Sequence, residues 1–148
     1  EYKLLIDFLD SKNLKYRVFS YNNKYNEEDF LTYIKSCKFG VVLGRHESQG
    51  FAIHEMMACN VPLLVWGATL RIQEYPEIRG YALVKSNVST VPYWSSECGE
   101  LFHEYYQIEH SYLTFMSNIH NYKPRQFILD NTSINACCKR WDELFNNL

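Results

Sequence analysis

The sequence lacks the features of a membrane-spanning or nucleic-acid-binding protein. None of its apolar runs approaches the roughly 20 residues that a transmembrane helix needs. Basic residues are not in excess, since 15 Lys and Arg stand against 17 Asp and Glu for a net charge of -2. Nucleic-acid-binding domains usually carry a basic surface. We therefore expect a soluble protein with no membrane span and no nucleic-acid partner.

Motifs for several common kinds of catalytic site are also missing. The five histidines never occur at the one- or three-residue separation typical of zinc ligands, so we expect no metal. Neither a Gly-x-Ser-x-Gly elbow nor a Walker loop occurs, which argues against the commonest hydrolases and P-loop enzymes. The five cysteines are an odd number with no Cys-x-x-Cys pair, which favours a reduced, cytoplasmic compartment.

The chain is well supplied with apolar residues. Its 148 residues are the length of one domain, and 47% of them are hydrophobic. A chain of this length typically buries roughly 70% of its unfolded surface. Because it shows no repeat, low-complexity stretch or linker, we expect residues 1–148 to form a single domain.

Hydrophobic periodicity predicts alternating helices and strands over the first 90 residues or so. The predicted helices cover 2–12, 27–37 and 51–59, and the predicted strands cover 15–20, 39–43, 61–65 and 81–84. The apolar runs of the second and third strands are typical of strands buried on both faces. Asn26 suits the N-cap of the second helix. This alternation predicts an α/β fold, a Rossmann-like parallel sheet with helices on both faces.

The last third of the chain has a different pattern. Apolar residues step by four and three from Leu101 to Ile119 and again from Ile134 to Leu148, which predicts two amphipathic helices. We expect them to pack on the sheet as a helical C-terminal tail. Before them, Val91-Pro92-Tyr93-Trp94 forms an aromatic loop, for which core packing is favoured over an acceptor-binding or domain-interface surface.

A polar loop between a buried strand and a helix carries the most informative residues. Residues 44–50 follow the carboxyl end of the strand, where open α/β sheets bind ligands. The helix that begins near Ser48 to Gly50 presents free backbone N–H groups and a positive dipole end, which suit a diphosphate. Gly50 lets a ligand approach the backbone closely.

Two glutamates are spaced for two different contacts. Glu47 lies at or before the helix start, and Glu55 lies eight residues later, up to roughly 12 Å along the axis. A diphosphate at the helix start would place a sugar near Glu47 and a ribose near Glu55. Carboxylates accept hydrogen bonds from the paired hydroxyls of either unit.

This segment resembles the signature of GT-B fold glycosyltransferases, Glu-Ser-x-Gly-x-x-x-x-Glu-Ala-Met-Ala-x-Gly-x-Pro. The sequence matches it at Glu47, Ser48, Gly50, Glu55, Met57, Ala58 and Pro62. It departs at Met56, where alanine is usual, and at Asn60, where glycine is usual. Asparagine tolerates a left-handed backbone better than most residues do, so the exchange at Asn60 is mild.

The resemblance implies a C-terminal domain that binds a nucleotide diphosphate sugar, within a longer enzyme whose N-terminal acceptor domain or partner chain completes the site. It implies that Glu47 contacts the donor sugar, as the catalytic candidate, and that Glu55 contacts the ribose. The implied phosphate contacts are the amides of Gln49, Gly50 and Phe51, and the other candidate contacts are Arg45, His46 and Ser48, with Tyr21 for the base. Many such enzymes need no bound metal, so no cofactor is expected beside the donor.

Two other functions fit parts of this pattern. One is a non-catalytic module that binds a sugar nucleotide or another protein. The other is a related enzyme such as a sugar-nucleotide epimerase, which would need a histidine or carboxylate pair across the cleft. The sequence assigns no such pair, although Arg71, after the strand at 61–65, is a further candidate for the cleft. The expected reaction is sugar transfer to a carbohydrate or other hydroxyl acceptor.

Overall fold

The computed structural model describes residues 1–20, 23–44, 46–72 and 85–147 as a mixed α/β chain. The elements are α1 (Tyr2–Ser11), α2 (Glu27–Ile34), β1 (Gly40–Leu43), α3 (Phe51–Ala58), β2 (Leu63–Trp66), β3 (Leu70–Ile72), β4 (Lys85–Asn87), η1 (Ser96–Cys98), β5 (Gly99–Phe102), η2 (Tyr105–Gln107), α5 (Ile108–Ser117), α6 (Pro124–Asn131) and α7 (Ile134–Asn146). None of the helices in these ranges combines the length and the apolar character needed to cross a membrane.

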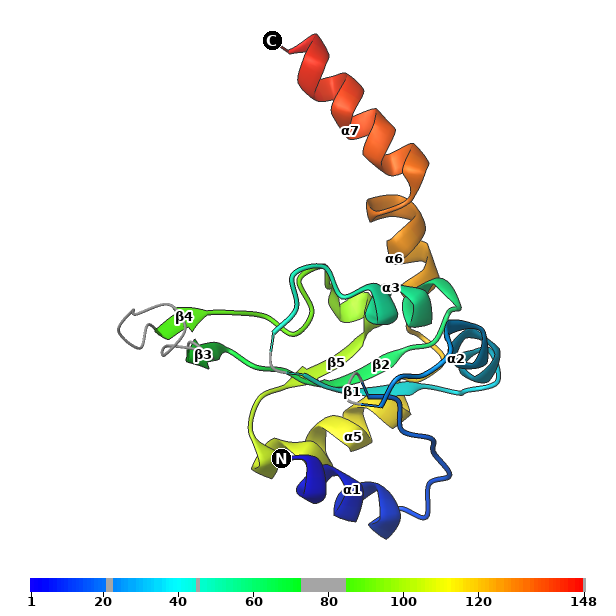
Figure 1. The fold of residues 1–148 in the computed structure, drawn as a ribbon, viewed down its shortest axis with the longest axis vertical. Coiled ribbons are helices and arrows are strands. Elements are labelled where there is room, and N and C mark those ends of the chain that lie inside the picture. The colour runs from blue at the N-terminus through cyan, green and yellow to red at the C-terminus, as the bar shows by residue number, and fades with distance from the viewer. Residues whose placement is uncertain (21–22, 45, 73–84, 148) are drawn as a thin grey trace.

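A small parallel sheet forms the centre of the fold (Figure 1). Its strand order is β1-β2-β5, and both pairings are parallel, with Leu63 of β2 opposite Gly40 on one side and Gly99 on the other. A second sheet joins β3 and β4 in antiparallel register. The parallel sheet expected from the apolar runs is therefore confirmed for β1 and β2.

Side chains of β2 alternate between two hydrophobic clusters, one on each face of the sheet. Leu64 and Trp66 face a cluster formed with α1, β5 and α5, while Leu63 and Val65 face a cluster that includes α3 and α6. Figure 1 shows α1 and α5 on one side of the sheet and α3 and α6 on the other. Burying each such side chain contributes about 1.5–3 kcal/mol. The prediction of helices on both faces is confirmed.

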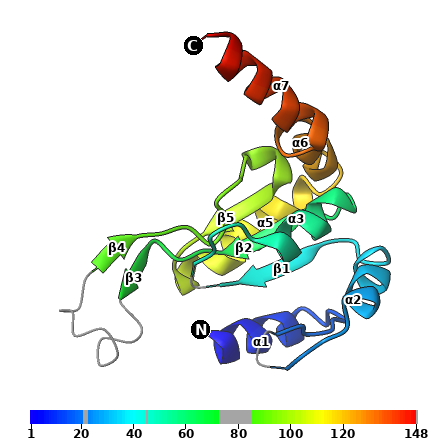
Figure 2. The same ribbon diagram turned by 45° about the horizontal axis from the view of Figure 1, so that its top comes forward.

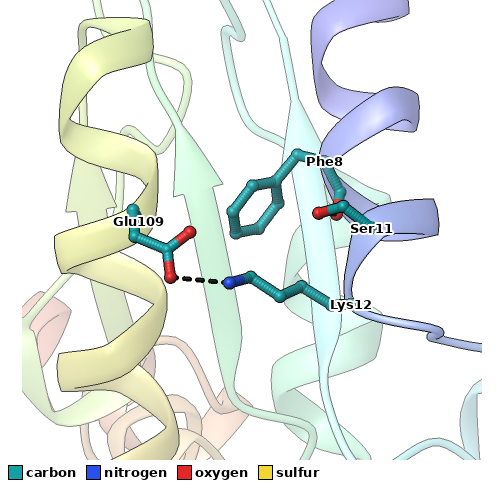
Figure 3. A network of polar contacts seen from close by, with 4 residues as sticks. All are labelled: Phe8, Ser11, Lys12 and Glu109. Atoms are coloured by element: carbon teal, nitrogen blue, oxygen red, sulfur yellow. Dashed lines mark hydrogen bonds and ion pairs between the residues drawn. The ribbon is translucent and has the colours of Figure 1, made fainter.

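Helices α1 and α5 meet through an apolar contact edged by an ion pair (Figure 3). The rings of Phe8 and Tyr112 pack edge to face, with centroids 5.5 Å apart. Beside them, Lys12 donates to the Glu109 carboxylate at 2.6 Å, as Figure 3 shows. Exposed ion pairs contribute roughly 0–1 kcal/mol. The buried rings therefore hold these helices together more than the ion pair does.

The C-terminal strand β5 replaces the start of a predicted helix. The four-and-three spacing predicted a helix from Leu101, but Leu101 lies in β5 and the α-helix begins only at Ile108. Gly99 explains the strand, because its φ is +147° and an added Cβ would lie 1.9 Å from the Leu63 carbonyl oxygen. Only glycine permits this approach to β2. The helical spacing of Leu101 is coincidental.

The predicted strand over 15–20 is wrong, because these residues form no strand and Ser20 makes only an isolated bridge to Asn23. Phe19 instead packs edge to face on Tyr25 and Phe30, at centroid distances of 5.4 and 5.1 Å. High β-propensity reflects side-chain packing as much as backbone preference. Here the packing partner is α2 rather than a neighbouring strand. The strand predicted over 81–84 lies outside the described residues.

The helix predicted from Ile134 is confirmed as α7, but it does not pack on the sheet. It follows α6 and extends away from the sheet in both views (Figures 1 and 2). None of its residues is buried, and Trp141 and Phe145 are exposed and stacked on each other. Before it, α6 packs against α3.

We predict that Phe115→Ala destabilises the domain far more than Leu113→Ala. Phe115 is fully buried between α5 and the sheet, whereas Leu113, on the same helix, is 57% exposed. Removing a buried phenylalanine ring costs about 3–5 kcal/mol, and exposed substitutions usually change stability by roughly 0.5 kcal/mol or less. Urea unfolding of both variants measures the difference, and equal losses would contradict this assignment of the core.

Candidate functional site

The candidate loop connects the carboxyl end of β1 to the start of α3. Gly50 is the N-cap residue of α3, and its carbonyl accepts the first helical hydrogen bond from the His54 amide at 3.0 Å. No side chain among the described residues caps this helix start. The first N–H groups of a helix have no acceptor within the helix. The start of α3 therefore presents the amides of Phe51, Ala52 and Ile53.

Gly50 has a left-handed backbone that favours glycine. Its φ is +70°, and a Cβ built there would lie 3.4 Å from the Ile53 side chain and 3.8 Å from Pro92. A Cβ would make only ordinary contacts there, so it is the positive φ that would strain any other residue. The predicted helix start near Ser48 to Gly50 is confirmed. Of the three amides proposed for a diphosphate, however, only that of Phe51 belongs to the helix, since Gln49 precedes the N-cap.

A segment far along the chain closes one side of this loop. The Glu47 amide donates to the Ser89 carbonyl at 3.0 Å. The buried Thr90 hydroxyl donates to the Gly44 carbonyl at 3.0 Å and accepts from the Ala68 amide at 2.8 Å. One side chain thus joins the loops that leave β1 and β2. Sequence reasoning missed Thr90, because no local pattern links it to partners 22 and 46 positions away.

Glu55 lies beside the N-terminus of α2. Burial raises the pKa of Glu55, and the nearby Glu27 carboxylate raises it further. The pKa of Tyr25 is also raised, first by burial and then by the charges of Glu55 and Glu27. Helices α2 and α3 are in contact, which brings the charges of Glu27 and Glu55 within range of each other. Tyr25, four residues after the Tyr21 expected to contact the base, therefore interacts electrostatically with the glutamate expected to contact a ribose.

His54 occupies the first turn of α3, between the two glutamates. Its ring packs edge to face on Tyr93, with centroids 5.3 Å apart. Burial lowers the pKa of His54, so the neutral ring is favoured at neutral pH. Its Nε2 atom is buried and makes no hydrogen bond within the described part of the chain. No sequence motif singled out this histidine or its contact with the aromatic loop.

The remaining candidate residues differ in exposure and in how far they can be placed. Ser48 and Gln49 are exposed, Glu47 and His46 are half-buried, and Phe51 is 71% exposed. Arg45 and Tyr21 lie outside the described residues. Arg71, the further cleft candidate, lies in β3 with its backbone paired to Ser86. The structure thus arranges residues 46–55 as one loop and helix, while it leaves the base contact and the Arg45 contact untested.

Asn60 ends α3 in the conformation that glycine usually provides. Its φ is +62°. The amides of Asn60 and Val61 donate to the carbonyls of Met57 and Met56 at 2.9 and 3.0 Å, the hydrogen-bond pattern of a Schellman motif. The expectation that asparagine substitutes mildly for glycine here is confirmed. This tight end also returns the chain directly into β2.

A surface hollow of about 560 Å³ lies at the other end of α3. It is lined by Asn60, Tyr122, Lys123, Arg125, Gln126 and Leu129. These residues stand at the C-terminal end of α3, whereas the candidate loop precedes its N-terminal end. We place the candidate site at the loop despite this hollow, because parallel sheets bind ligands beyond the carboxyl ends of their strands.

Neither a metal centre nor a known relative adds to this description. Within the described ranges, no group of three or more His, Cys, Asp or Glu side chains is arranged to hold a metal ion. Comparisons of the chain with protein-family models, with curated proteins and with solved structures found no match. The functional assignment therefore depends on the geometry of the loop and of α3.

We predict that Glu55→Gln stabilises the fold at neutral pH. Because the pKa of Glu55 is raised in the folded chain, the folded state binds its proton more tightly than the unfolded state does. Stability therefore falls as the pH rises through the unfolded-state pKa of about 4.3, and the loss persists at higher pH. Thermal unfolding should give a higher midpoint for the variant at pH 7, and the difference should vanish below about pH 4.

The matched control for this change is Glu28→Gln. Glu28 is exposed in the first turn of α2, where a negative charge interacts favourably with the helix dipole. Neutralising it should lower the unfolding midpoint slightly at pH 7. A loss of stability in Glu55→Gln that equals the loss in Glu28→Gln would show that Glu55 carries no unfavourable charge.

We also predict that Thr90→Val destabilises the domain by about 1–3 kcal/mol, because it leaves the Ala68 amide without its acceptor. Valine preserves the shape of threonine, so the change isolates the hydroxyl. Thr69→Val, at an exposed position nearby, serves as the control and should alter stability by roughly 0.5 kcal/mol or less. Chemical denaturation measures the free energy of unfolding of both variants. A Thr90→Val variant as stable as wild type would refute the bridging role.

Proposed function

We propose that this chain is the donor-binding domain of a glycosyltransferase, which transfers a sugar from a nucleotide diphosphate sugar to an acceptor. One observation carries the proposal. The loop after the carboxyl end of the parallel strand β1 leads to Gly50, whose left-handed backbone starts α3. Glu47 precedes this helix start, and Glu55 lies within the helix, five residues after Gly50. This order of groups matches the order of sugar, diphosphate and ribose in such a donor.

The diphosphate would bind at the start of α3. The aligned peptide dipoles amount to roughly half a positive charge at a helix N-terminus. The amides of Phe51, Ala52 and Ile53 are the donors available there, because no described side chain caps the helix. Backbone donors that are fixed before binding lose little freedom when an anion arrives, which favours recognition of phosphate oxygens.

The two carboxylates would bind the units on either side of the diphosphate. Glu55 is half-buried beside Tyr25, so its oxygens can accept from ribose hydroxyls next to an aromatic ring for the base. Glu47, held through its amide by Ser89, would accept from hydroxyls of the donor sugar. A sugar hydroxyl supplies a hydrogen bond that offsets the repulsion between Glu55 and Glu27.

Transfer itself would depend on stabilising the leaving group. The bond between the anomeric carbon and the diphosphate oxygen breaks, and its electron pair leaves with the diphosphate. The acceptor hydroxyl oxygen bonds to the same carbon and loses its proton to a base or water. The fixed amides at the start of α3 would stabilise the growing negative charge on the diphosphate. Glu47, beside the sugar, is the proposed catalytic residue of this chain.

The proposal includes an N-terminal acceptor domain or a partner chain that completes the cleft, and it requires no metal. A cytoplasmic location is proposed with it, which fits the five free cysteines. A non-catalytic sugar-nucleotide-binding or interaction module is the second candidate.

Ligand-induced stabilisation tests donor binding directly. UDP, GDP, ADP and their common sugar conjugates would be added to the full chain during thermal unfolding. A ligand at 100 times its dissociation constant adds about 2.7 kcal/mol to stability. We expect one nucleotide family to raise the midpoint and Glu55→Gln to remove most of the shift, because it replaces one of the two carboxylate oxygens that accept from the ribose with an NH2 donor and removes the charge.

Two controls make this experiment decisive. Glu28→Gln changes an exposed charge on the neighbouring helix and should leave the ligand shift intact. Glu47→Gln should reduce the midpoint shift caused by sugar conjugates more than the shift caused by free nucleoside diphosphates, since only the conjugates carry the donor sugar. If no nucleotide stabilises the folded wild-type chain, or if Glu55→Gln responds like wild type, the proposed donor site is wrong.

A further inference from the structure

Two exposed aromatic side chains flank the candidate loop without a role in donor binding. Phe51, the first residue of α3, is 71% exposed, and Tyr93, in the aromatic loop, is 48% exposed. The predicted core packing of that loop holds for two of its four residues: Val91 is buried and Trp94 packs against the same cluster, while Pro92 is exposed. The Tyr93 ring is therefore the aromatic side chain of this loop that is exposed and lies outside the core cluster.

The two rings are linked through α3. His54 lies three residues after Phe51, on the same face of the helix. The His54 ring contacts Tyr93 at a centroid distance of 5.3 Å. Pro92, which precedes Tyr93, would lie 3.8 Å from a Cβ at Gly50. The aromatic loop and the first turn of α3 thus form one continuous surface.

This surface adjoins the loop that carries Glu47. Helical side chains lean toward the N-terminus of their helix, so the ring of Phe51 extends over the turn that precedes it. That turn contains Ser48, Gln49 and Gly50, of which the first two are exposed and polar. An exposed ring, preceded by exposed hydrogen-bonding side chains, therefore lies four residues after the glutamate assigned to the donor sugar.

We propose that Phe51 and Tyr93 form a platform for one sugar ring of the acceptor, which makes the acceptor a carbohydrate. This inference rests on the proposed transferase function. A pyranose ring presents C–H groups on one face and hydroxyls around its rim. The electron-rich face of an aromatic ring attracts such C–H groups, while Ser48 and Gln49 can hydrogen-bond to the rim. An acceptor held here would bring a hydroxyl toward the donor sugar at Glu47.

The size of the patch favours a sugar over a protein partner. Aromatic side chains offer about 150–250 Å² each when fully buried, so the exposed parts of these two rings amount to roughly 200 Å². A stable protein interface buries about 800 Å² on each partner. The polar side chains around the rings are likewise unlike the apolar centre of a protein interface. One sugar ring matches both the area and the mixed chemistry.

Saturation-transfer NMR on the full chain tests the platform with defined probes. Maltotriose, cellotriose, chitotriose and mannotriose would each be titrated into wild type, Phe51→Ala, Tyr93→Ala and the control Tyr106→Ala. Tyr106 is 81% exposed on η2, away from the candidate loop. We expect at least one trisaccharide to bind through its ring C–H protons, and each platform variant to weaken it by roughly two- to tenfold. Tyr106→Ala should bind as wild type does.

A further variant separates stacking from simple apolar contact and from misfolding. Phe51→Leu keeps an apolar side chain and a good helix former but removes the ring. It should fold as wild type by circular dichroism and yet lose affinity about as strongly as Phe51→Ala. Wild-type affinity in Phe51→Leu, or equal losses in Tyr106→Ala and Phe51→Ala, would overturn the platform. So would the absence of any bound trisaccharide in the wild-type chain.

The same variants distinguish this inference from the proposed donor site. Tyr93→Ala changes no residue assigned to the donor, so stabilisation by the nucleotide should persist in it. Nucleotide stabilisation without trisaccharide binding would overturn the platform and leave the donor site standing. Trisaccharide binding that depends on Phe51, in a chain that no nucleotide stabilises, would support the platform and remove the donor site.

Discussion

Burial of β2 is the constraint on which the rest of the structure depends. All four of its residues are buried, and it pairs with β1 on one side and β5 on the other. Leu63 and Val65 face one layer of helices, and Leu64 and Trp66 face the other. A strand that is apolar on both faces must be covered on both faces. This requirement draws α3 and α6 to one side and α1 and α5 to the other, and it fixes the edge where the loops emerge.

Beyond that edge, β1 and β2 no longer pair through their backbones, and one side-chain hydroxyl forms hydrogen bonds to both connecting loops. Thr90 joins the Gly44 carbonyl after β1 to the Ala68 amide after β2. A buried polar group without a partner is costly, so this bridge holds both loops in place. It also brings the aromatic loop against the start of α3, where Pro92 approaches Gly50. The same contacts that close the edge therefore shape the surface beside Glu47.

Helix α3 is bounded by two left-handed residues that set its direction. Gly50 opens it with φ +70° and Asn60 follows its end with φ +62°. Between them, Glu55 stands close to Glu27 and Tyr25 in an arrangement that disfavours its charge. Binding sites commonly keep groups that cost stability in the absence of ligand. The proposed ribose contact gives this carboxylate a use, and the exposed ring of Phe51 is explained in the same way by the proposed acceptor.

The sequence by itself determined the elements whose signals are local. Apolar runs predicted β1 and β2, periodicity predicted α1, α2, α3 and α7, and side-chain chemistry predicted the Asn26 cap and the Asn60 turn. Only the tertiary structure decided which segments pair and which faces are covered. Gly99 lets β5 pair with β2, and Phe19 packs on helix α2 rather than in a strand. Helix α7 has no buried residue. Thr90, His54 and Tyr93 lie at the candidate loop although Thr90 and Tyr93 are distant from it in sequence. The physical reason is that propensity and periodicity act over a few residues, whereas strand pairing and burial depend on more distant partners, from 11 positions for Phe19 and Phe30 to 46 for Gly44 and Thr90.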